Sequence, residues 1–454
     1  MNNQEIYSIS PIDGRYSRST QRLREFFSEG ALIKYRVLIE IEYFVALYNL
    51  PISELSELSD SDIEKIKDIE KNFSGKDAQR VKEIEKSTNH DIKAVEYFIK
   101  EKFEELGLAN YKEWVHFGLT SQDINNTAFP LMLKDSVFLE VLPAIENVLD
   151  KLEELSEEYK NQSMLAYTHG QAASPTKLGK ELYVFFERIE NQTEQLKNMY
   201  FPAKFGGATG NFNAHAVAFP EVDWVKFANN LVENSLGLRR SKVTTQIEHY
   251  DNLAAIFDCL KRICTIIIDL NRDMWTYISK DYFKQKISKN EVGSSAMPHK
   301  VNPIDFENSE GNMGIAIALF EHLSAKLPIS RLQRDLTDST VLRNIGVPIA
   351  HMIISLKASL KGLEKLMLNK KALDDDLDSN PMVIAEAIQT VLRKINYPKP
   401  YEKLKELTRT NKSISLQDLY SFIDSLDIEN KYKEKLKALN PHNYTGYDLD
   451  SLLK

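Results

Sequence analysis

The sequence predicts an all-α protein: an extended bundle of long helices forms a central domain, flanked by two smaller helical domains. The first reason is helical periodicity with few helix-breaking residues. It runs through residues 134–160, 175–200, 247–287, 305–326 and 336–370. The second reason is that polar stretches rich in helix breakers separate these segments, as loops separate the helices of a bundle. The third is that no strand-rich region stands out beside them.

Length and composition set the expected organisation. At 454 residues the chain exceeds one ordinary core, so two or three domains are expected. We place three, at residues 1–110, 111–365 and 366–454. Apolar residues make up 43% and charged residues 27%, which is typical of a globular protein in water. No apolar run reaches the roughly 18 residues of a membrane helix, and the N-terminus lacks a signal pattern. We therefore expect a cytoplasmic protein.

Charge, cysteine spacing and motif content limit which ligands, metals and cofactors are expected. A net charge of -8 argues against a nucleic-acid surface, so an anionic small molecule would need a local cluster of cations. The two cysteines, Cys259 and Cys264, have neither disulfide nor metal spacing, and we expect reduced core thiols. No metal-ligand spacing or cofactor fingerprint occurs, so neither a metal nor a cofactor is expected.

The N-terminal elements begin with a turn. Residues 10–17 carry turn chemistry and present Arg15 and Tyr16, a cation beside a phenol. Helical periodicity starts near Arg22, and shorter helices with Glu–Lys spacing fill residues 53–107. By itself this turn is weak evidence of function.

Two polar breaks precede the long helices. Residues 87–91, STNHD, have the capping residues of a helix N-terminus, which can also present N–H groups to an anion. His90 there could equally lie on the surface. The second break spans residues 116–126, where Thr120 and Ser121 followed by an aspartate can cap a new helix and offer hydroxyls to a ligand.

Two further breaks lie between long helices. Residues 167–177 place His169 before Gly170 in a non-helical run, where a catalytic and a structural histidine are about equally expected. Residues 206–215 are rich in glycine but fit neither the Rossmann nor the P-loop pattern. We therefore expect no nucleotide-phosphate role for this loop.

One helical stretch predicts assembly. Residues 263–270, ICTIIIDL, are apolar on nearly every side. A helix that is apolar all round must be buried, and in a rod-like bundle this indicates contact with neighbouring chains. We therefore expect an oligomer.

A cluster of cations follows the last long loop. Arg331, Arg334 and Arg343 alternate with acidic residues and Ser339, and Ser339 shares a helical face with Arg343. A solvated, salt-bridged helix start and an anion-binding site both fit this pattern. Shorter helices from residue 371 onward predict a smaller C-terminal unit.

The stretch at residues 293–308 is the strongest candidate for function. Its glycine and prolines forbid a continuous helix, and it carries Ser294, Ser295 and Lys300. Free backbone N–H groups beside a cation form an anion cradle. A plain connector is the alternative, but loops this long in a helical bundle are more often functional.

Together the loops offer hydroxyls, histidines, amides and cations, which suit proton transfer on an anionic substrate without a cofactor. A β-elimination needs a base for a carbon acid, donors for the carboxylate that takes up charge, and an acid for the leaving group. Stabilising the developing dianion is expected to be the largest effect.

The loop sequence GSSAMPHKVNP at residues 293–303 resembles the signature of the fumarase/aspartase superfamily. Five further motifs resemble the adenylosuccinate lyase family within it, in order along essentially the whole chain. They are SPIDGRY at 10–16, TNHDIKAVEY at 88–97, TSQDINN at 120–126, THGQ at 168–171 and RDLTDSTVLRN at 334–344.

The resemblance implies a carbon–nitrogen lyase that cleaves adenylosuccinate to AMP and fumarate, and succinyl-carboxamide imidazole ribotide (SAICAR) to AICAR and fumarate. It implies Ser294 as general base and His169 as general acid. The implied substrate-binding residues are Arg15, Tyr16, Asn89, His90, Asp91, Thr120, Ser121, Gln246, Lys300, Val301, Asn302, Asn308, Arg334, Ser339 and Arg343.

The resemblance also implies a homotetramer whose active sites are shared between subunits. Argininosuccinate lyase or fumarase is the alternative within the superfamily, but neither shares the predicted phosphate-binding set. A non-catalytic structural protein on the same scaffold is the alternative from another class. The joint presence of Ser294, His169 and Lys300 argues against it.

Overall fold

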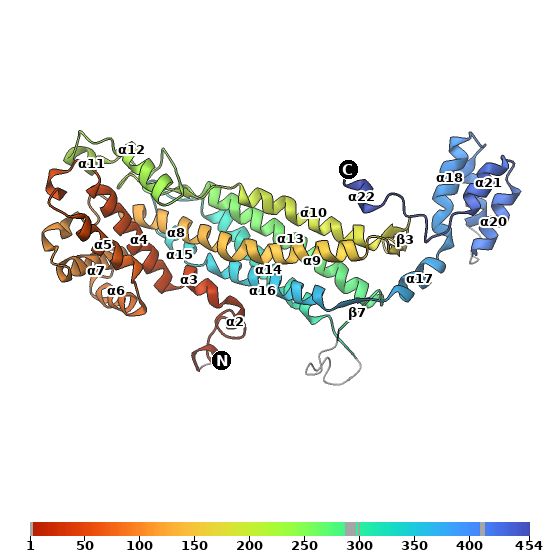
Figure 1. Ribbon diagram of the computed structural model, residues 1–454, viewed down its shortest axis with the longest axis horizontal. Helices are drawn as coiled ribbons and strands as arrows, with labels where there is room; N and C mark the ends of the chain where they lie inside the picture. Colours follow the sequence, from red (N-terminus) through yellow and green to blue (C-terminus); the bar gives the residue numbers. More distant parts are fainter. Residues whose placement is uncertain (1–2, 287–296, 298–299, 409–413) are drawn as a thin grey trace. The chain divides into compact units, whose positions relative to one another are not determined.

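The computed structural model describes residues 3–286, 297, 300–408 and 414–454 (Figure 1). Within them the chain is helical, and its strands are only two or three residues long. The chain divides into two compact units. Unit 1 consists of Met1–Ile145, Gln192–Thr265 and Gly311–Lys357, and unit 2 consists of Glu146–Asn191, Ile266–Glu310 and Ala358–Lys454. The predicted all-α fold is confirmed, and the three-domain division stays a prediction.

Unit 1 holds the N-terminal helices and parts of the long ones. Its elements are α1 (Asn3–Ile6), α2 (Ser17–Thr20), η1 (Gln21–Leu23), α3 (Arg24–Phe27), α4 (Glu29–Tyr48), η2 (Ser53–Leu55), α5 (Asp60–Lys71), α6 (Gly75–Thr88), α7 (Asp91–Glu105), η3 (Ala109–Trp114), α8 (Ser121–Ser136), η4 (Val137–Val141), β5 (Pro202–Ala203), α11 (Asn213–Ala218), α12 (Trp224–Asn229), η5 (Asn230–Ser235), β6 (Arg239–Arg240) and α15 (Thr337–Leu342). β5 pairs with β6 in parallel.

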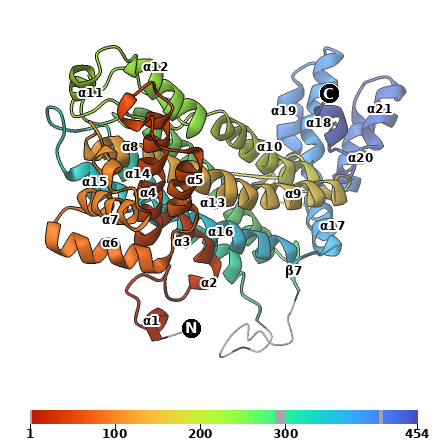
Figure 2. The ribbon, with the colours of Figure 1, turned by 60° about the vertical axis from the view of Figure 1, so that its left-hand side comes forward.

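Five helices belong partly to each unit, because the boundary between the units falls inside them. They are α9 (Leu142–Glu158), α10 (Leu178–Lys197), α13 (Asp251–Ser279), α14 (Ile304–Lys326) and α16 (Gly346–Glu364). Within unit 2, α9 and α10 run side by side in both views (Figures 1 and 2).

The remaining elements lie in unit 2. They are β1 (Ser163–Met164), β2 (Tyr167–Thr168), β3 (Gln171–Ala172), β4 (Thr176–Lys177), β7 (Phe283–Gln285), β8 (Leu366–Leu368), α17 (Lys370–Asp378), η6 (Pro381–Ile384), α18 (Ala385–Lys394), α19 (Pro400–Thr408), α20 (Leu416–Ser425), α21 (Asn430–Lys437) and α22 (Leu449–Leu452). The strands pair antiparallel as β1 with β4, β2 with β3 and β7 with β8. α18 to α21 enclose a small core that includes Ile388, Leu419 and Leu436 (Figure 2).

The predicted long helices are present, with three main differences in their bounds. The helix predicted at 247–287 covers only Asp251–Ser279, and residues 283–285 form β7 instead. The helix predicted at 134–160 begins earlier, at Ser121, and continues through one π-helical turn into α9. Its first turns bury polar residues, including Asn126 and Thr127, so an apolar period cannot reveal them. The helix predicted at 336–370 is split into α15 and α16. Gly346 opens α16 where a Cβ would lie 2.5 Å from Phe27, so the chain packs closely at this break.

The apolar side chains of the stretch at 263–270 are largely buried by other residues of the same chain. Ile263, Ile267 and Leu270 are fully buried, and Cys259 and Cys264 are free thiols in the same helix, as predicted. This stretch therefore does not by itself require a neighbouring chain. One described segment, Thr337–Glu364, is long and apolar enough to cross a membrane, but 67% of its most apolar window is buried inside the protein. That burial is typical of a core helix.

Candidate active site

The first predicted break forms the junction between α6 and α7. Asn89 ends α6 in left-handed backbone (φ 50), a conformation that asparagine adopts more readily than most residues. His90 caps α7, and its Nδ1 accepts a hydrogen bond from the Lys93 N–H at 3.1 Å. Because Nδ1 is the acceptor, a neutral His90 ring carries its proton on Nε2. The half-exposed ring can therefore donate that proton in a hydrogen bond to a ligand.

Asp91, the first residue of α7, joins two arginines. Its Oδ2 accepts from Arg36 at 2.8 Å and from Arg343 at 2.9 Å, and Arg343 also donates to Glu29 at 2.8 Å. The Arg36 side chain is only 2% exposed, and it also donates to Asn125 at 3.0 Å. Burial opposes ionisation of Asp91, but the two guanidinium groups together hold its pKa below the ordinary value. The carboxylate therefore stays charged and orients Arg343.

The second predicted break is a capped helix start. Thr120 and Asp123 form a capping box at the N-terminus of α8, in which the Thr120 N–H donates to Asp123 Oδ2 at 2.8 Å. The predicted cap is confirmed. Ser121 is the first residue of α8, so the cap fixes the place of its backbone at the helix start.

The glycine-rich loop supports this cap. Asp123 is fully buried and accepts from Lys204 at 2.7 Å and from the N–H groups of Gly206 and Gly207 at 2.9 and 3.1 Å. Burial lowers the pKa of Lys204, against the opposing effect of Asp123. The backbone N–H groups of this loop bind an anion, and that anion is the carboxylate of Asp123.

In the predicted cation cluster, Arg334 and Ser339 contact each other directly. Arg334 donates to Ser339 Oγ at 2.7 Å and to Asp338 Oδ1 at 3.3 Å. Asp338 is buried and accepts from the Tyr250 phenol at 2.9 Å, and the Asn126 amide donates to the same phenol at 2.7 Å. Tyr250 is fully buried and has left-handed backbone (φ 63), which is strained for an aromatic residue. It connects the start of α13 to α8 and α15.

One cavity of about 530 Å³ unites these clusters. Its walls come from α6, α7, α8 and α15, all in unit 1. The predicted residues that line it are Asn89, His90, Asp91, Ser121, Arg334, Ser339 and Arg343. The residues that were not predicted are Glu85, Gln122, Asn125, Leu336, Thr340 and Asn344. Of the latter, Gln122 and Asn125 lie inside the TSQDINN motif, and that motif was the available sequence signal; their burial was seen only in the structure.

Four predicted residues of unit 1 do not line this cavity. Thr120 serves as the cap of α8. Gln246 is half-buried in the loop before α13. Arg15 is exposed on the N-terminal turn, where its guanidinium lies 5.8 Å from the centre of the Tyr16 ring.

In unit 2, His169 stands at the tip of a β-hairpin. Thr168 pairs with Gln171, so His169 and Gly170 are the two residues of the turn. Both have positive φ, 55 and 72, which is the backbone of a type I′ hairpin turn. Glycine adopts it freely, and histidine more readily than a β-branched residue. The turn therefore presents an exposed imidazole.

The predicted loop at 293–308 is described only in part. Gly293, Ser294 and Ser295 lie outside the described residues. Lys300 is exposed, with its N–H donating to the Met297 carbonyl at 3.0 Å. Val301 accepts from Gln285 at 3.2 Å. Asn302 follows in the loop, and Asn308 lies in the first turns of α14; both are half-buried.

Comparison with known proteins decides the family. Residues 14–317 match the family described as Lyase, and residues 330–445 match the family described as Adenylosuccinate lyase C-terminal. The adenylosuccinate lyase of Dictyostelium discoideum is 57% identical over 452 residues, with 97% of each chain covered. That of Escherichia coli K12 is 47% identical over 443 residues, again with 97% of each chain covered. The chain belongs to the adenylosuccinate lyase family.

Solved structures agree on the fold of this family. The 3-carboxy-cis,cis-muconate lactonizing enzyme of Pseudomonas putida superposes with a TM-score of 0.73 over 94% of each chain, at 18% identity. At that identity the likeness shows the fold alone. The family matches and the curated relatives confirm the predicted family, lyase class and adenylosuccinate lyase function, and the roles of single residues stay predictions. Among the described residues, no three His, Cys, Asp or Glu side chains are grouped as metal ligands.

Proposed function

We propose that the protein eliminates fumarate from adenylosuccinate, giving AMP, and from SAICAR, giving AICAR, without a cofactor. The observation that carries the proposal is the cavity of unit 1, which gathers most of the predicted binding residues of that unit around Arg334 and Arg343. The printed name of the relatives supports the choice of substrate. In the cell, the reaction would belong to purine nucleotide biosynthesis.

The arginines of the cavity would hold the substrate's phosphate. Arg334 is fixed by Asp338 and Ser339, and Arg343 by Asp91 and Glu29, so both guanidinium groups are oriented before a ligand arrives. A phosphate bound to Arg343 would compete with Glu29, whose side chain is 43% exposed. Arg15, Tyr16 and Ser339 would complete the phosphate and ribose contacts. His90 would bind the substrate and help to orient His169, and Asn89, Asp91 and Val301 would also contact the substrate. The succinyl carboxylates and nearby groups would be held by Thr120, Ser121, Gln246, Lys300, Asn302 and Asn308.

The chemical step would be a β-elimination with two proton transfers. Ser294 would take a proton from the succinyl Cβ, and the C–H electron pair would pass through the adjacent carboxylate and become the new carbon–carbon double bond. The C–N bond would break with its electrons on nitrogen, and His169 would protonate that nitrogen. An ordinary serine is too weakly acidic to exist as an alkoxide, so loop N–H groups and Lys300 must stabilise it.

Turnover of purified protein tests the proposal. Adenylosuccinate should be lost with stoichiometric release of fumarate and AMP, while argininosuccinate in a parallel assay should remain intact. Arg343→Gln should raise KM for adenylosuccinate by about tenfold or more, because it removes a charged donor worth about 1.5–3 kcal/mol. Cleavage of argininosuccinate without cleavage of adenylosuccinate would reject this function in favour of the alternative lyase.

We further propose a homotetramer with active sites shared between subunits. Support comes from α14, whose exposed face between Gly311 and Ala318 contains no charge and includes Gly314 and Ile315. Open space surrounds Gly311 and Gly314, so another helix could approach that face closely. Inactive Ser294→Ala and His169→Ala proteins, dissociated and reassembled together, should regain part of the activity. Mixtures as inactive as their parents would count against shared sites.

The proposed location is the cytoplasm. The free thiols of Cys259 and Cys264 support it, because reduced cysteines are typical of reducing compartments. Fractionation of the source cells should recover the activity with cytoplasmic marker enzymes. Recovery in a membrane or secreted fraction would exclude this location.

A further inference from the structure

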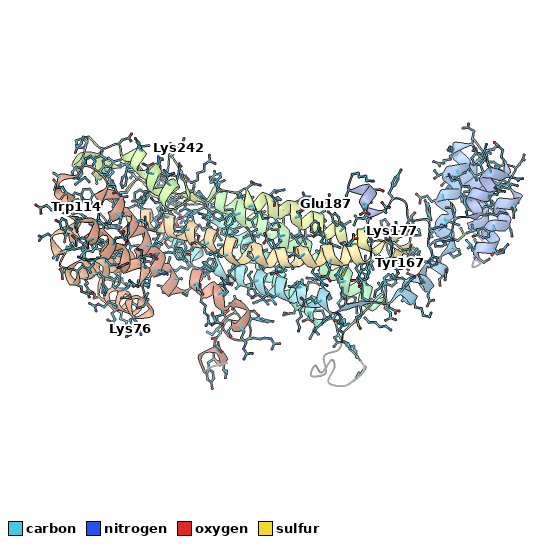
Figure 3. All side chains as sticks on the ribbon, in the orientation of Figure 1. Lys76, Trp114, Tyr167, Lys177, Glu187 and Lys242 are labelled. Atoms are coloured by element: carbon cyan, nitrogen blue, oxygen red, sulfur yellow. The ribbon has the colours of Figure 1, made fainter. Side chains whose placement is uncertain are left out.

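The hairpin that carries His169 is held on both sides by residues of the C-terminal helices, all within unit 2. The hairpin spans residues 163–177, formed by β1 with β4 and by β2 with β3. Figure 3 labels Tyr167 and Lys177, which belong to its opposite strands. Inside the hairpin, the Ala173 N–H donates to the Ala166 carbonyl at 2.9 Å.

The first contact lies two residues before His169. The Tyr167 O–H lies 2.9 and 2.7 Å from the two oxygens of Asp376, in α17. Lys280 completes the arrangement: its ammonium lies 3.5 Å from the centre of the Tyr167 ring and 3.7 Å from Asp376. The buried Tyr282 phenol donates to the same carboxylate. Asp376 thus fixes the incoming strand of the hairpin to a buried aromatic residue.

The second contact lies on the outgoing strand. The Ser174 hydroxyl donates to Glu386 Oε2, in α18, and Tyr444 O–H donates to the same oxygen at 2.9 Å. The hydroxyl contacts from Ser174 and Tyr444 hold the pKa of Glu386 below its ordinary value, so the carboxylate stays ionised near neutral pH. At the base of the hairpin, the Ser163 hydroxyl donates to the His442 carbonyl at 2.6 Å.

We propose that Asp376 and Glu386 are positioning residues for the general acid, so that the C-terminal helices set the reach of His169 toward the leaving nitrogen. This inference rests on the proposed function, in which His169 donates that proton. The tip itself is exposed, and its imidazole is placed by a two-residue turn. Tyr167 and Ser174, on either side of that turn, are held by hydrogen bonds to the C-terminal helices. These contacts restrict the tilting of the hairpin relative to those helices. Proton transfer depends steeply on such placement, since a displacement of about 1 Å can cost about 100-fold in rate.

The test compares Tyr167→Phe, Asp376→Asn, their double variant and Glu386→Gln. Each should lower kcat by about 10- to 100-fold while KM for adenylosuccinate stays within about twofold, because substrate binding is untouched. The Tyr167→Phe and Asp376→Asn losses should not add in the double variant, since both remove the same contact. The matched control is Tyr48→Phe, which removes another Tyr–Asp contact, from Tyr48 to Asp60 at 3.1 Å, and should keep full activity.

Hydrogen exchange provides a readout independent of activity. Backbone amides of peptides covering 163–177 should exchange faster in Tyr167→Phe, which leaves the contact of Tyr282 with Asp376 in place, with other peptides of unit 2 unchanged. Unchanged exchange and unchanged kcat would overturn the proposal, as would a loss in which KM rises as much as kcat falls. A wild-type protein that does not cleave adenylosuccinate would overturn the proposed function and with it the catalytic role. The exchange result would then still decide whether the contacts hold the hairpin.

Discussion

The cavity of unit 1 and the His169 hairpin of unit 2 hold their functional groups in different ways. In the cavity, Asp91 and Asp338 connect arginines to buried partners, and Arg36 is almost fully enclosed. In the hairpin, His169 is exposed and only its neighbours in the strands are held. The groups proposed to bind a charged substrate are thus fixed through buried charge networks. The group proposed to transfer a proton is positioned by a backbone turn, which leaves its ring accessible.

The largest expected effect is that of removing the imidazole at the hairpin tip. His169→Gln should lower kcat by about 100- to 10,000-fold, the range typical of losing a general acid, with little change in KM. Fumarate release under saturating substrate measures it. A variant within tenfold of the wild-type kcat would show that the hairpin does not carry the acid.

The next effect concerns the charge network of the cavity. Asp91→Asn leaves Arg36 buried without its carboxylate, so it should reduce the free energy of unfolding by about 3 kcal/mol and raise KM. Urea unfolding and steady-state kinetics measure the two effects. The matched control is Glu101→Gln, which breaks the exposed pair of Arg80 and Glu101 and should cost below about 1 kcal/mol. Equal losses in both variants would contradict a buried network.

A pH experiment compares a buried histidine of unit 1, which does not line the cavity, with a carboxylate that contacts the hairpin. Burial lowers the pKa of His215, in unit 1, to about 4, so the folded protein keeps this ring neutral while the unfolded chain titrates near the ordinary value of 6.5. The folded state binds fewer protons between these values. Stability from His215 is therefore present above about pH 6.5 and is lost as pH falls toward 4. The lowered pKa of Glu386 in the hairpin contacts gives a loss only below its ordinary value of 4.5.

Between pH 7 and pH 5 the buried His215 should therefore cost the wild type about 2 kcal/mol of unfolding free energy, and His215→Gln should lack this loss. Urea unfolding at both pH values measures the difference. The control is His249→Gln, which alters an exposed histidine and should follow the wild type. Parallel pH dependence in wild type and His215→Gln would mean that the ring is not held neutral.

The smallest expected effect tests the support behind Arg334. Tyr250→Phe removes one phenol that serves both Asn126 and Asp338. A hydrogen bond of this kind contributes about 0.5–1.5 kcal/mol, so KM should rise by about fivefold with kcat nearly unchanged. An unchanged KM would show that Asp338 orients Arg334 without the phenol.

Much of the cavity could be predicted as separate pieces. His90 and Thr120 lie at helix starts whose capping residues are visible in the sequence. Ser339 and Arg343 were expected on one face, and both line the cavity. What could not be predicted was the support beneath them. Lys204 binds Asp123 across 81 positions of the chain, and no local pattern indicates such a pair.

The sequence by itself determined the long helices, their polar breaks and the family, because periodicity, capping residues and motif spacing are local properties of the chain. It also indicated a non-helical run around His169 and Gly170, but the hairpin turn with positive φ at both residues was seen only in the structure. Only the tertiary structure decided which breaks share a cavity and that Tyr167 meets Asp376, 209 positions away. The physical reason is that a carboxylate selects its partners by proximity in the folded chain, and folding brings together groups whose separation in sequence carries no signal.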